Sequence, residues 1–160
     1  YVGYMPHGIE LFEGSFADNI ARFGTVDQDA VVRAATEAGM DAFIRAQPQG
    51  YDTSIGEEGK RLSGGQRQKL GLARALYGPV RLLVLDEPNS NLDLAGEQDL
   101  LKALAAAKAR GCTVVVMTHR RGVLDAADKL LILRDGVQQA FGPREEVLAA
   151  LQQAAAKAKA

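Results

Sequence analysis

Short apolar runs, each bounded by turn residues, mark the expected strands of this 160-residue chain. A continuous run of this kind is typical of a strand that is buried on both faces of a sheet. Two such runs cover residues 82–85 and 113–117, and a third covers 128–134. Asp135-Gly136 then predicts a hairpin turn into residues 137–141. Residues 1–5 are expected to form the end of one further strand.

Helices are expected between these runs. Apolar residues recur at helical spacing over residues 27–40, and residues 94–109 are rich in alanine and leucine. Shorter helical segments are expected at 18–23 and 41–46, and Pro143 suits the first position of a closing helix through Leu151. Strands that alternate with helices predict an α/β fold with parallel pairing, to which the final hairpin adds an antiparallel element.

Composition and charge limit the classes of partner. The chain is long enough for a domain with a core, and its 19 basic and 20 acidic residues give a formal net charge of −1. This balance argues against a large electrostatic footprint for nucleic acid, so we expect no nucleic-acid partner. The longest apolar runs are about a quarter of the roughly 20 residues that a membrane span needs. Because the chain begins with Tyr1, we expect it to be a piece of a longer polypeptide.

The segment RLSGGQRQKLGLAR at residues 61–74 contains the first candidate site. Ser63 and Gln66 have the S-x-x-Q form of a capping box, which predicts that a helix starts here and runs from about Gly64 to Tyr77. Gly64 and Gly65 leave the amides of the first turn without side-chain cover. Unsatisfied N–H groups and roughly half a positive charge at a helix N-terminus suit an anion such as phosphate. An ordinary capped helix after a glycine turn is the alternative interpretation.

The second candidate site is the acidic pair Asp86-Glu87, which follows the apolar run at 82–85 and is stopped by Pro88. Ligands of open α/β sheets bind at the carboxyl ends of the strands, where the backbone turns and both carboxylates can serve one site. One carboxylate can hold Mg²⁺ through water while the other orients an attacking water. His119 follows the run at 113–117 and would lie at the same edge if the two strands are neighbours. A solvated strand end and a helix cap are the simpler alternatives for these residues.

Four motifs occur in a fixed order: LSGGQ at 62–66, LLVLDE at 82–87, SNLD at 90–93 and TH at 118–119. Together they resemble the signature motif, Walker B, D-loop and H-loop of the ATP-binding cassette (ABC) ATPases. YMPH at 4–7 resembles the start of the Q-loop. The resemblance implies part of a P-loop NTPase fold, with a helical and signature subdomain at about 8–77. The Walker B, D-loop and H-loop part of the core and a C-terminal helix would then occupy about 78–160.

Further stretches resemble the exporter class of this family. TSIGEEG at 53–59 is similar to the X-loop of exporters, and ELFEGSFADNI at 10–20 is similar to the segment after their Q-loop. DEPNSNLD at 86–93, ARALYGP at 73–79 and QAFGPREEVL at 139–148 are most similar to bacterial type I secretion ATPases. That resemblance implies an ATPase that powers export at the cytoplasmic face of the bacterial inner membrane, with ATP and Mg²⁺ as cofactors. The alternatives are a non-transport ABC-type ATPase lobe and a catalytically inactive regulatory half of an asymmetric dimer.

The resemblance also implies a role for each motif residue. Asp86 would bind Mg²⁺ through water, Glu87 would polarise the hydrolytic water, and His119 would contact the γ-phosphate. The residues expected to contact nucleotide held by a partner, or to communicate with that partner, are Ser63, Gly64, Gly65, Gln66 and Asp93. The partner would be a second nucleotide-binding domain in a homodimer, with a heterodimer as the alternative. The transmembrane domain of the same polypeptide and secretion accessory proteins are the other expected partners.

Two features depart from the family pattern. His7 stands at the position of the Q-loop glutamine, where its imidazole could contact the metal or its water in a pH-dependent way. The 160 residues also hold no G-x-x-x-x-G-K-[ST] phosphate loop. We therefore expect the isolated chain to hydrolyse ATP negligibly. We also expect apolar surface to be exposed at 82–85 and on neighbouring strands.

Overall fold

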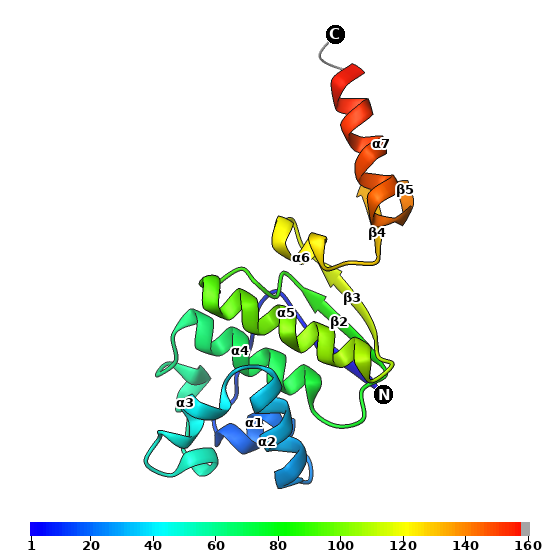
Figure 1. Cartoon of the computed structure of the whole chain (residues 1–160). Coiled ribbons are helices and arrows are strands. Elements are labelled where there is room, and N and C mark those ends of the chain that lie inside the picture. The colour runs from blue at the N-terminus through cyan, green and yellow to red at the C-terminus, as the bar shows by residue number, and fades with distance from the viewer. Residues whose placement is uncertain (158–160) are drawn as a thin grey trace. The chain divides into compact units, whose positions relative to one another are not determined.

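The computed structural model describes residues 1–157. They fall into two compact units, Tyr1–Thr118 and a second unit that begins at His119. The first unit is built on a sheet of three parallel strands, β1 (Val2–Met5), β2 (Leu82–Asp86) and β3 (Thr113–Met117), in the order β1-β2-β3. Tyr4 pairs with Val84, and Val84 pairs with Val115. The predicted parallel pairing is confirmed, and it brings the carboxyl ends of all three strands to one edge of the sheet (Figure 1).

Helices α1 (Phe16–Ile20), α2 (Gln28–Glu37) and α3 (Asp41–Arg45) follow β1, and two 3₁₀ turns lie at Gly50–Asp52 and Glu57–Gly59. The predicted helix over 27–40 ends at Glu37 because Gly39, at φ +68°, turns the chain before α3. Helices α4 (Gly64–Leu76) and α5 (Leu94–Ala109) occur where they were predicted. Helix α4 packs on β1 and α5 packs on β3.

The sheet has one covered face and one open face. Met5, Leu83 and Leu85 are almost fully buried, whereas the residues between them along each strand are half-buried or exposed. The expectation that 82–85 and 113–117 are buried on both faces is therefore wrong for this chain. The apolar surface expected at 82–85 and its neighbours lies on the open face, which carries Val2, Tyr4, Leu82, Val84, Val115 and Met117.

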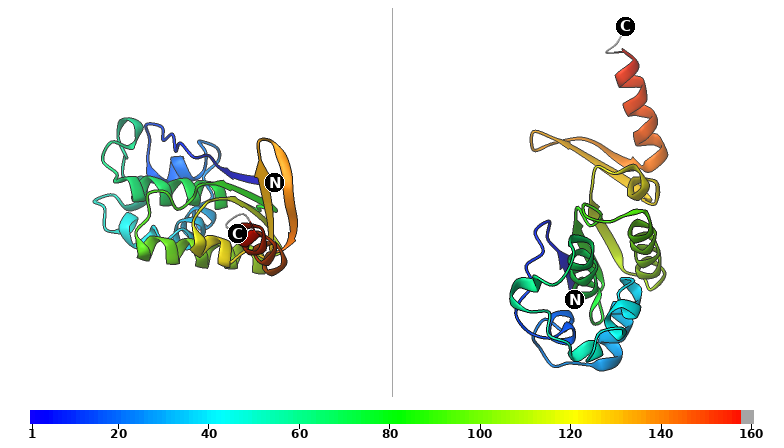
Figure 2. Two further views of the ribbon diagram at one scale, coloured as in Figure 1. Left: turned by 90° about the horizontal axis from the view of Figure 1, so that it is seen from above. Right: turned by 90° about the vertical axis from the view of Figure 1, so that its left-hand side faces the viewer.

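The second unit contains α6 (Arg121–Asp125), β4 (Lys129–Arg134), β5 (Val137–Pro143) and α7 (Arg144–Lys157). The predicted antiparallel hairpin is confirmed, because β4 and β5 pair as a two-stranded sheet. The expectation that its first strand is buried is wrong, because only Leu130 of β4 is buried. Asp135 and Gly136 both have positive φ angles, as the two-residue hairpin turn requires. The hairpin leads directly into α7 (Figure 2), because Pro143 ends β5 rather than opening the helix. No helix in residues 1–157 has the length and apolarity of a membrane span.

Candidate functional site

The acidic pair lies at the carboxyl edge of the three-stranded sheet, as expected. Asp86 is the last residue of β2, the central strand, and it pairs with Met117 of β3. Glu87 follows, and both residues are half-buried. His7 lies two residues beyond the end of β1 and is exposed. Because the strands are parallel, His7 and the acidic pair belong to the same edge of the sheet.

The backbone turns sharply at Glu87. Its φ is +47°, a left-handed conformation that is uncommon for a residue with a side chain. Such a conformation costs of the order of 1–3 kcal/mol and persists only where the surrounding structure holds it. The Glu87 N–H donates to the carbonyl of Met117 at 2.9 Å, so β3 fixes one side of the turn. The sequence predicted that the chain turns here but gave no sign of how the turn is held.

The D-loop, residues 90–93, follows this turn and joins it to α5. Asn89, just before it, is completely buried, and its Oδ1 accepts a hydrogen bond from Thr118 Oγ1 at 3.2 Å. The Asp93 side chain caps α5 by accepting a bond from the Gly96 N–H at 2.7 Å. This cap is a role for Asp93 that the family resemblance did not include. The contact predicted for Asp93 across a dimer stays a prediction.

The signature segment begins α4 with the predicted capping box. The Ser63 hydroxyl accepts from the Gln66 N–H at 3.2 Å, and Gln66 Oε1 accepts from the Ser63 N–H at 2.9 Å. Ser63 and Gly64 are exposed, so the start of the helix is open to a ligand. The Gln66 side chain serves the cap, so its predicted contact with nucleotide stays untested. The signature motif at 62–66 therefore presents mainly Ser63, Gly64 and Gly65.

The D-loop lies against the start of the signature helix. A Cβ atom placed on Gly64 would lie 3.5 Å from Asn91 Cβ, and one placed on Gly65 would lie 3.1 Å from the Asn91 carbonyl oxygen. The second distance is tighter than an ordinary van der Waals contact. Glycine at position 65 therefore lets the D-loop backbone approach the helix. This contact brings the signature motif and the segment after the acidic pair together within one chain.

Sequence reasoning missed Gln68, a polar side chain on the buried face of α4. Only 2% of the residue is exposed, and its amide bonds to the segment that follows Asp86. The available signal was a glutamine in register with the buried residues Leu72 and Ala75 along the helix. That signal alone does not identify the partners, because they lie in a distant segment of the sequence.

A salt bridge links the two helices that flank the site. Lys69 Nζ of α4 lies 2.9 Å from Asp99 Oδ2 of α5, and Lys69 also donates to the Gly39 carbonyl at 3.5 Å. The hydrogen bond from Lys69 is the main cause that lowers the pKa of the Asp99 carboxyl below its ordinary value. Asp99 thus stays ionised and keeps α4 and α5 connected.

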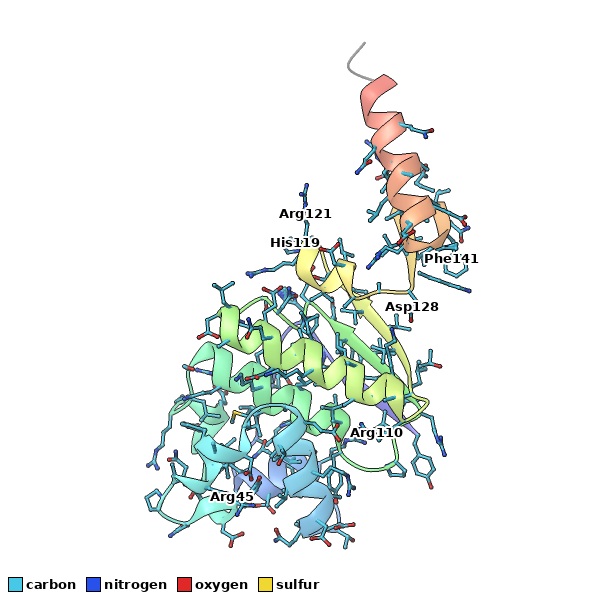
Figure 3. The ribbon with its side chains drawn as sticks, viewed as in Figure 1. Arg45, Arg110, His119, Arg121, Asp128 and Phe141 are labelled. Carbon is cyan, nitrogen blue, oxygen red and sulfur yellow. The ribbon has the colours of Figure 1, made fainter. Side chains whose placement is uncertain are left out.

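His119 is the one predicted catalytic residue that lies outside the first unit. It is exposed and begins the second unit, on the segment that leads into α6 (Figure 3). Its predicted contact with a phosphate stays a prediction, as does the predicted metal role of His7.

The acidic pair has the chemistry of a shared magnesium site. Mg²⁺ that accompanies a nucleotide is held by one or two carboxylates, waters and phosphate oxygens rather than by an all-protein cage. Within residues 1–157, no group of three or more histidine, cysteine or acidic side chains could hold a metal by itself. The half-buried Asp86 and Glu87 at an open sheet edge fit a metal whose remaining ligands come with the nucleotide.

Comparison with known proteins gives a consistent result. Residues 1–90 match the family described as "ABC transporter". The chain is 50% identical over 149 residues to the type I secretion system ATP-binding protein PrsD of Rhizobium meliloti (strain 1021), covering 92% of this chain and 26% of that protein. It is 40% identical over 149 residues to the mitochondrial potassium channel ATP-binding subunit of Xenopus tropicalis. That match covers 92% of this chain and 21% of that protein.

It is also 36% identical over 147 residues to an ATP-dependent lipid A-core flippase of Burkholderia thailandensis (strain E264), covering 92% of this chain and 24% of that protein. Among solved structures, a bacterial Atm1-family ABC exporter with ATP bound matches with a TM-score of 0.84 and 34% identity, over 92% of this chain and 26% of that chain. The chain thus spans about a quarter of the length of these relatives.

Proposed function

We propose that this chain, which belongs to the ABC transporter family, is the part of an exporter's ATP-hydrolysing domain that carries the signature motif, the acidic pair and the D-loop. The observation that carries the proposal is the contact between the signature helix and the D-loop at the sheet edge that ends in Asp86 and Glu87. An ATP-hydrolysing site needs a helix start that is open to a phosphate and an acidic pair suited to magnesium. In a head-to-tail dimer, each chain supplies its acidic pair to one site and its helix start to the other.

Each residue of the site has a distinct proposed role. Asp86 holds the metal through water, and Glu87 accepts a proton from the attacking water and orients it for in-line attack on the γ-phosphate. Bound Mg²⁺ supplies positive charge to the phosphate oxygens. Ser63, Gly64 and Gly65 donate hydrogen bonds to the γ-phosphate of ATP that is held by a second nucleotide-binding domain. The two domains are arranged head to tail in a homodimer. His119 donates to the same phosphate, and His7 contacts the metal or its water.

The cargo that we propose is protein, as in type I secretion. The support is the higher identity to PrsD, 50%, than to the lipid A-core flippase, 36%. On the same grounds, we propose that the native protein lies at the cytoplasmic face of the bacterial inner membrane, with a transmembrane domain in the same polypeptide and secretion accessory proteins as partners.

The test replaces Glu87 by glutamine in the native protein that contains this chain. We expect Glu87→Gln to lower the kcat of Mg²⁺-dependent ATP hydrolysis by about 10²- to 10⁴-fold, the range typical for loss of a general base. Binding of ATP should remain, because the variant keeps Asp86. Glu146→Gln, the same change at an exposed position of α7, should leave kcat unchanged. In cells, Glu87→Gln should also stop protein secretion and leave the transport of lipid A unchanged.

The isolated 160-residue chain should show no Glu87-dependent hydrolysis. Mg²⁺-dependent ATP hydrolysis by the purified chain that Glu87→Gln abolishes would contradict this expectation. A native protein whose ATP hydrolysis is insensitive to Glu87→Gln would instead support the inactive regulatory half. Loss of lipid A transport with intact protein secretion would overturn the proposed cargo.

A further inference from the structure

Gln68 is one of three polar side chains that are almost completely buried in the described residues, together with Asn19 and Asn89. A buried amide that lacks hydrogen bonds costs several kcal/mol. The hydrogen-bond partners of a buried amide therefore show which segments of the chain it connects. Gln68 lies on the second turn of α4, between the signature glycines and the helix interior. Its hydrogen-bond partners Glu87, Ser90 and Asn91 lie in one short segment of the chain, residues 87–91.

Both ends of the Gln68 amide are used. Its Nε2 donates to the Glu87 carbonyl at 2.8 Å and to Ser90 Oγ at 3.0 Å, and its Oε1 accepts from the Asn91 N–H at 2.7 Å. A carbonyl on one side and an N–H on the other fix the orientation of the amide. In the flipped amide, the side-chain oxygen would face the Glu87 carbonyl and the side-chain NH₂ would face the Asn91 N–H. Gln68 therefore takes the place of a strand partner for the backbone that leaves β2.

The turn at Glu87 is held from two sides as a result. Its N–H is bound by the Met117 carbonyl of β3 at 2.9 Å, and its carbonyl accepts from Gln68 and from the Ser90 N–H at 3.2 Å. The strained φ of +47° thus lies between one anchor in the sheet and one in the signature helix. Of these anchors, only Gln68 connects Glu87 to the helix whose first residues are proposed to meet the nucleotide.

We propose that Gln68 is a positioning residue that holds the Glu87 backbone and the D-loop to the signature helix. The water-orienting carboxylate then keeps a fixed position at its own site, while the helix start of the same chain faces nucleotide held by the second domain. This inference rests on the proposed function of Glu87 and of the signature motif. We call the hydrogen bonds from Gln68 to residues 87–91 the clamp. Loss of the clamp displaces the Glu87 carboxylate relative to the attacked phosphate. A misplacement of about 1 Å can lower a rate by roughly 10²-fold without changing how the substrate binds.

Three substitutions separate the two ends of the amide. Gln68→Met keeps the length of the side chain and removes every hydrogen bond. Gln68→Glu keeps an acceptor for the Asn91 N–H but, as a carboxylate, cannot donate to the Glu87 carbonyl. Gln68→Asn keeps an amide that is one methylene too short to reach both partners. Gln98→Met repeats the first change at an exposed position of α5 and serves as the matched control.

The first measurement is amide hydrogen exchange in the 160-residue chain, which needs no ATP hydrolysis. We expect the Asn91 amide to exchange at least about tenfold faster in Gln68→Met, as loss of a hydrogen bond of roughly 1.4 kcal/mol implies. In Gln68→Glu and Gln98→Met it should exchange within about threefold of wild type. An Asn91 amide whose exchange is insensitive to Gln68→Met contradicts the clamp, whatever the native protein does.

The second measurement is steady-state ATP hydrolysis by the native protein. We expect Gln68→Met and Gln68→Glu to lower kcat by about 10- to 100-fold with the KM for ATP within about twofold, and Gln98→Met to change neither. Low kcat in Gln68→Glu, where Asn91 exchange stays slow, assigns the effect to the Glu87 contact. If Gln68→Met does not fold, as judged by thermal unfolding, Gln68→Asn is expected to show the same kcat loss in smaller degree.

The two hypotheses fail differently. Wild-type hydrolysis that does not depend on Glu87 overturns the proposed function, whereas the exchange result still reports the clamp. Glu87-dependent hydrolysis whose kcat is unchanged by all three Gln68 substitutions overturns the positioning role and leaves the proposed function intact. A loss that appears only in KM also overturns it, because positioning of the base acts on the chemical step.

Discussion

Gly3 of β1 shows how a single residue sets the distance between the sheet and the signature helix. A Cβ atom at this position would lie 2.0 Å from the Ala75 carbonyl oxygen of α4 and 3.0 Å from Leu83 Cδ1. The clashing group is helix backbone, which cannot rotate away as a flexible side chain can. Any side chain at position 3 must therefore push α4 off the strand.

We predict that Gly3→Ala lowers the free energy of unfolding by about 2–3 kcal/mol, the upper part of the range for overpacking. Gly8→Ala, where a Cβ would meet nothing within 4 Å, should change it by less than about 0.5 kcal/mol. Urea unfolding followed by far-UV circular dichroism measures both. Equal stabilities for the two variants would show that α4 does not depend on contact at Gly3.

The residues that sequence predicts well are those whose partners are close in the chain. The capping box of Ser63 and Gln66 forms because both bonds join residues three positions apart. Gln68 was missed because its partners are 19 to 23 positions away, and only the fold brings them together. The Asp93 cap of α5 had a local signal, an aspartate just before a helix, and could have been found.

Helices α4 and α5 are the elements that carry the site, and the Lys69–Asp99 salt bridge is the charged link between them. Because the pKa of Asp99 is lowered in the folded chain, the pair stabilises the fold at a pH above the ordinary carboxyl pKa of about 3.9. That contribution is lost as the pH falls through the lower pKa of the folded state. Its size is limited by the partial exposure of both side chains.

We predict that Asp99→Asn lowers the free energy of unfolding by about 0.5–1 kcal/mol at pH 7 and that the difference from wild type largely disappears near pH 3. Lys102→Met should have a smaller effect, because Lys102 lies 3.6 Å from Asp99 and is mostly exposed. Chemical unfolding at several pH values measures both variants. A difference between wild type and Asp99→Asn that grows as the pH falls would have the wrong sign for this pair.

The type and order of the elements followed from the sequence, but their surroundings did not. Residues 82–85 and 113–117 form the predicted parallel strands, yet an apolar run has the same pattern whether one or both faces are covered. The run at 128–134 was assigned to the core for the same reason and pairs only with β5. Which strand neighbours which, and what covers each face, depends on contacts between distant residues.

At the scale of the whole molecule, the fold is confirmed, and the 160 residues hold some but not all of the motifs of an ATP-hydrolysing site. Its parallel sheet and flanking helices are part of the P-loop NTPase fold of ABC ATPases, as the match to the Atm1-family exporter shows. The division at about residue 78 into a helical and a core part stays a prediction. The signature helix start is open, and the 160 residues hold no phosphate loop. We propose that Ser63 acts on nucleotide associated with the Glu87 of another chain.

The most direct test of this claim places Glu87→Gln and Ser63→Arg in native dimers that are purified through two different tags. With one substitution on each chain, a site shared between chains leaves one of two sites intact, and about half of the wild-type ATP hydrolysis is expected. With both substitutions on the same chain beside a wild-type partner, both sites lose a residue and hydrolysis should disappear. The opposite result, activity with both substitutions on one chain and none when they are separated, would contradict the claim.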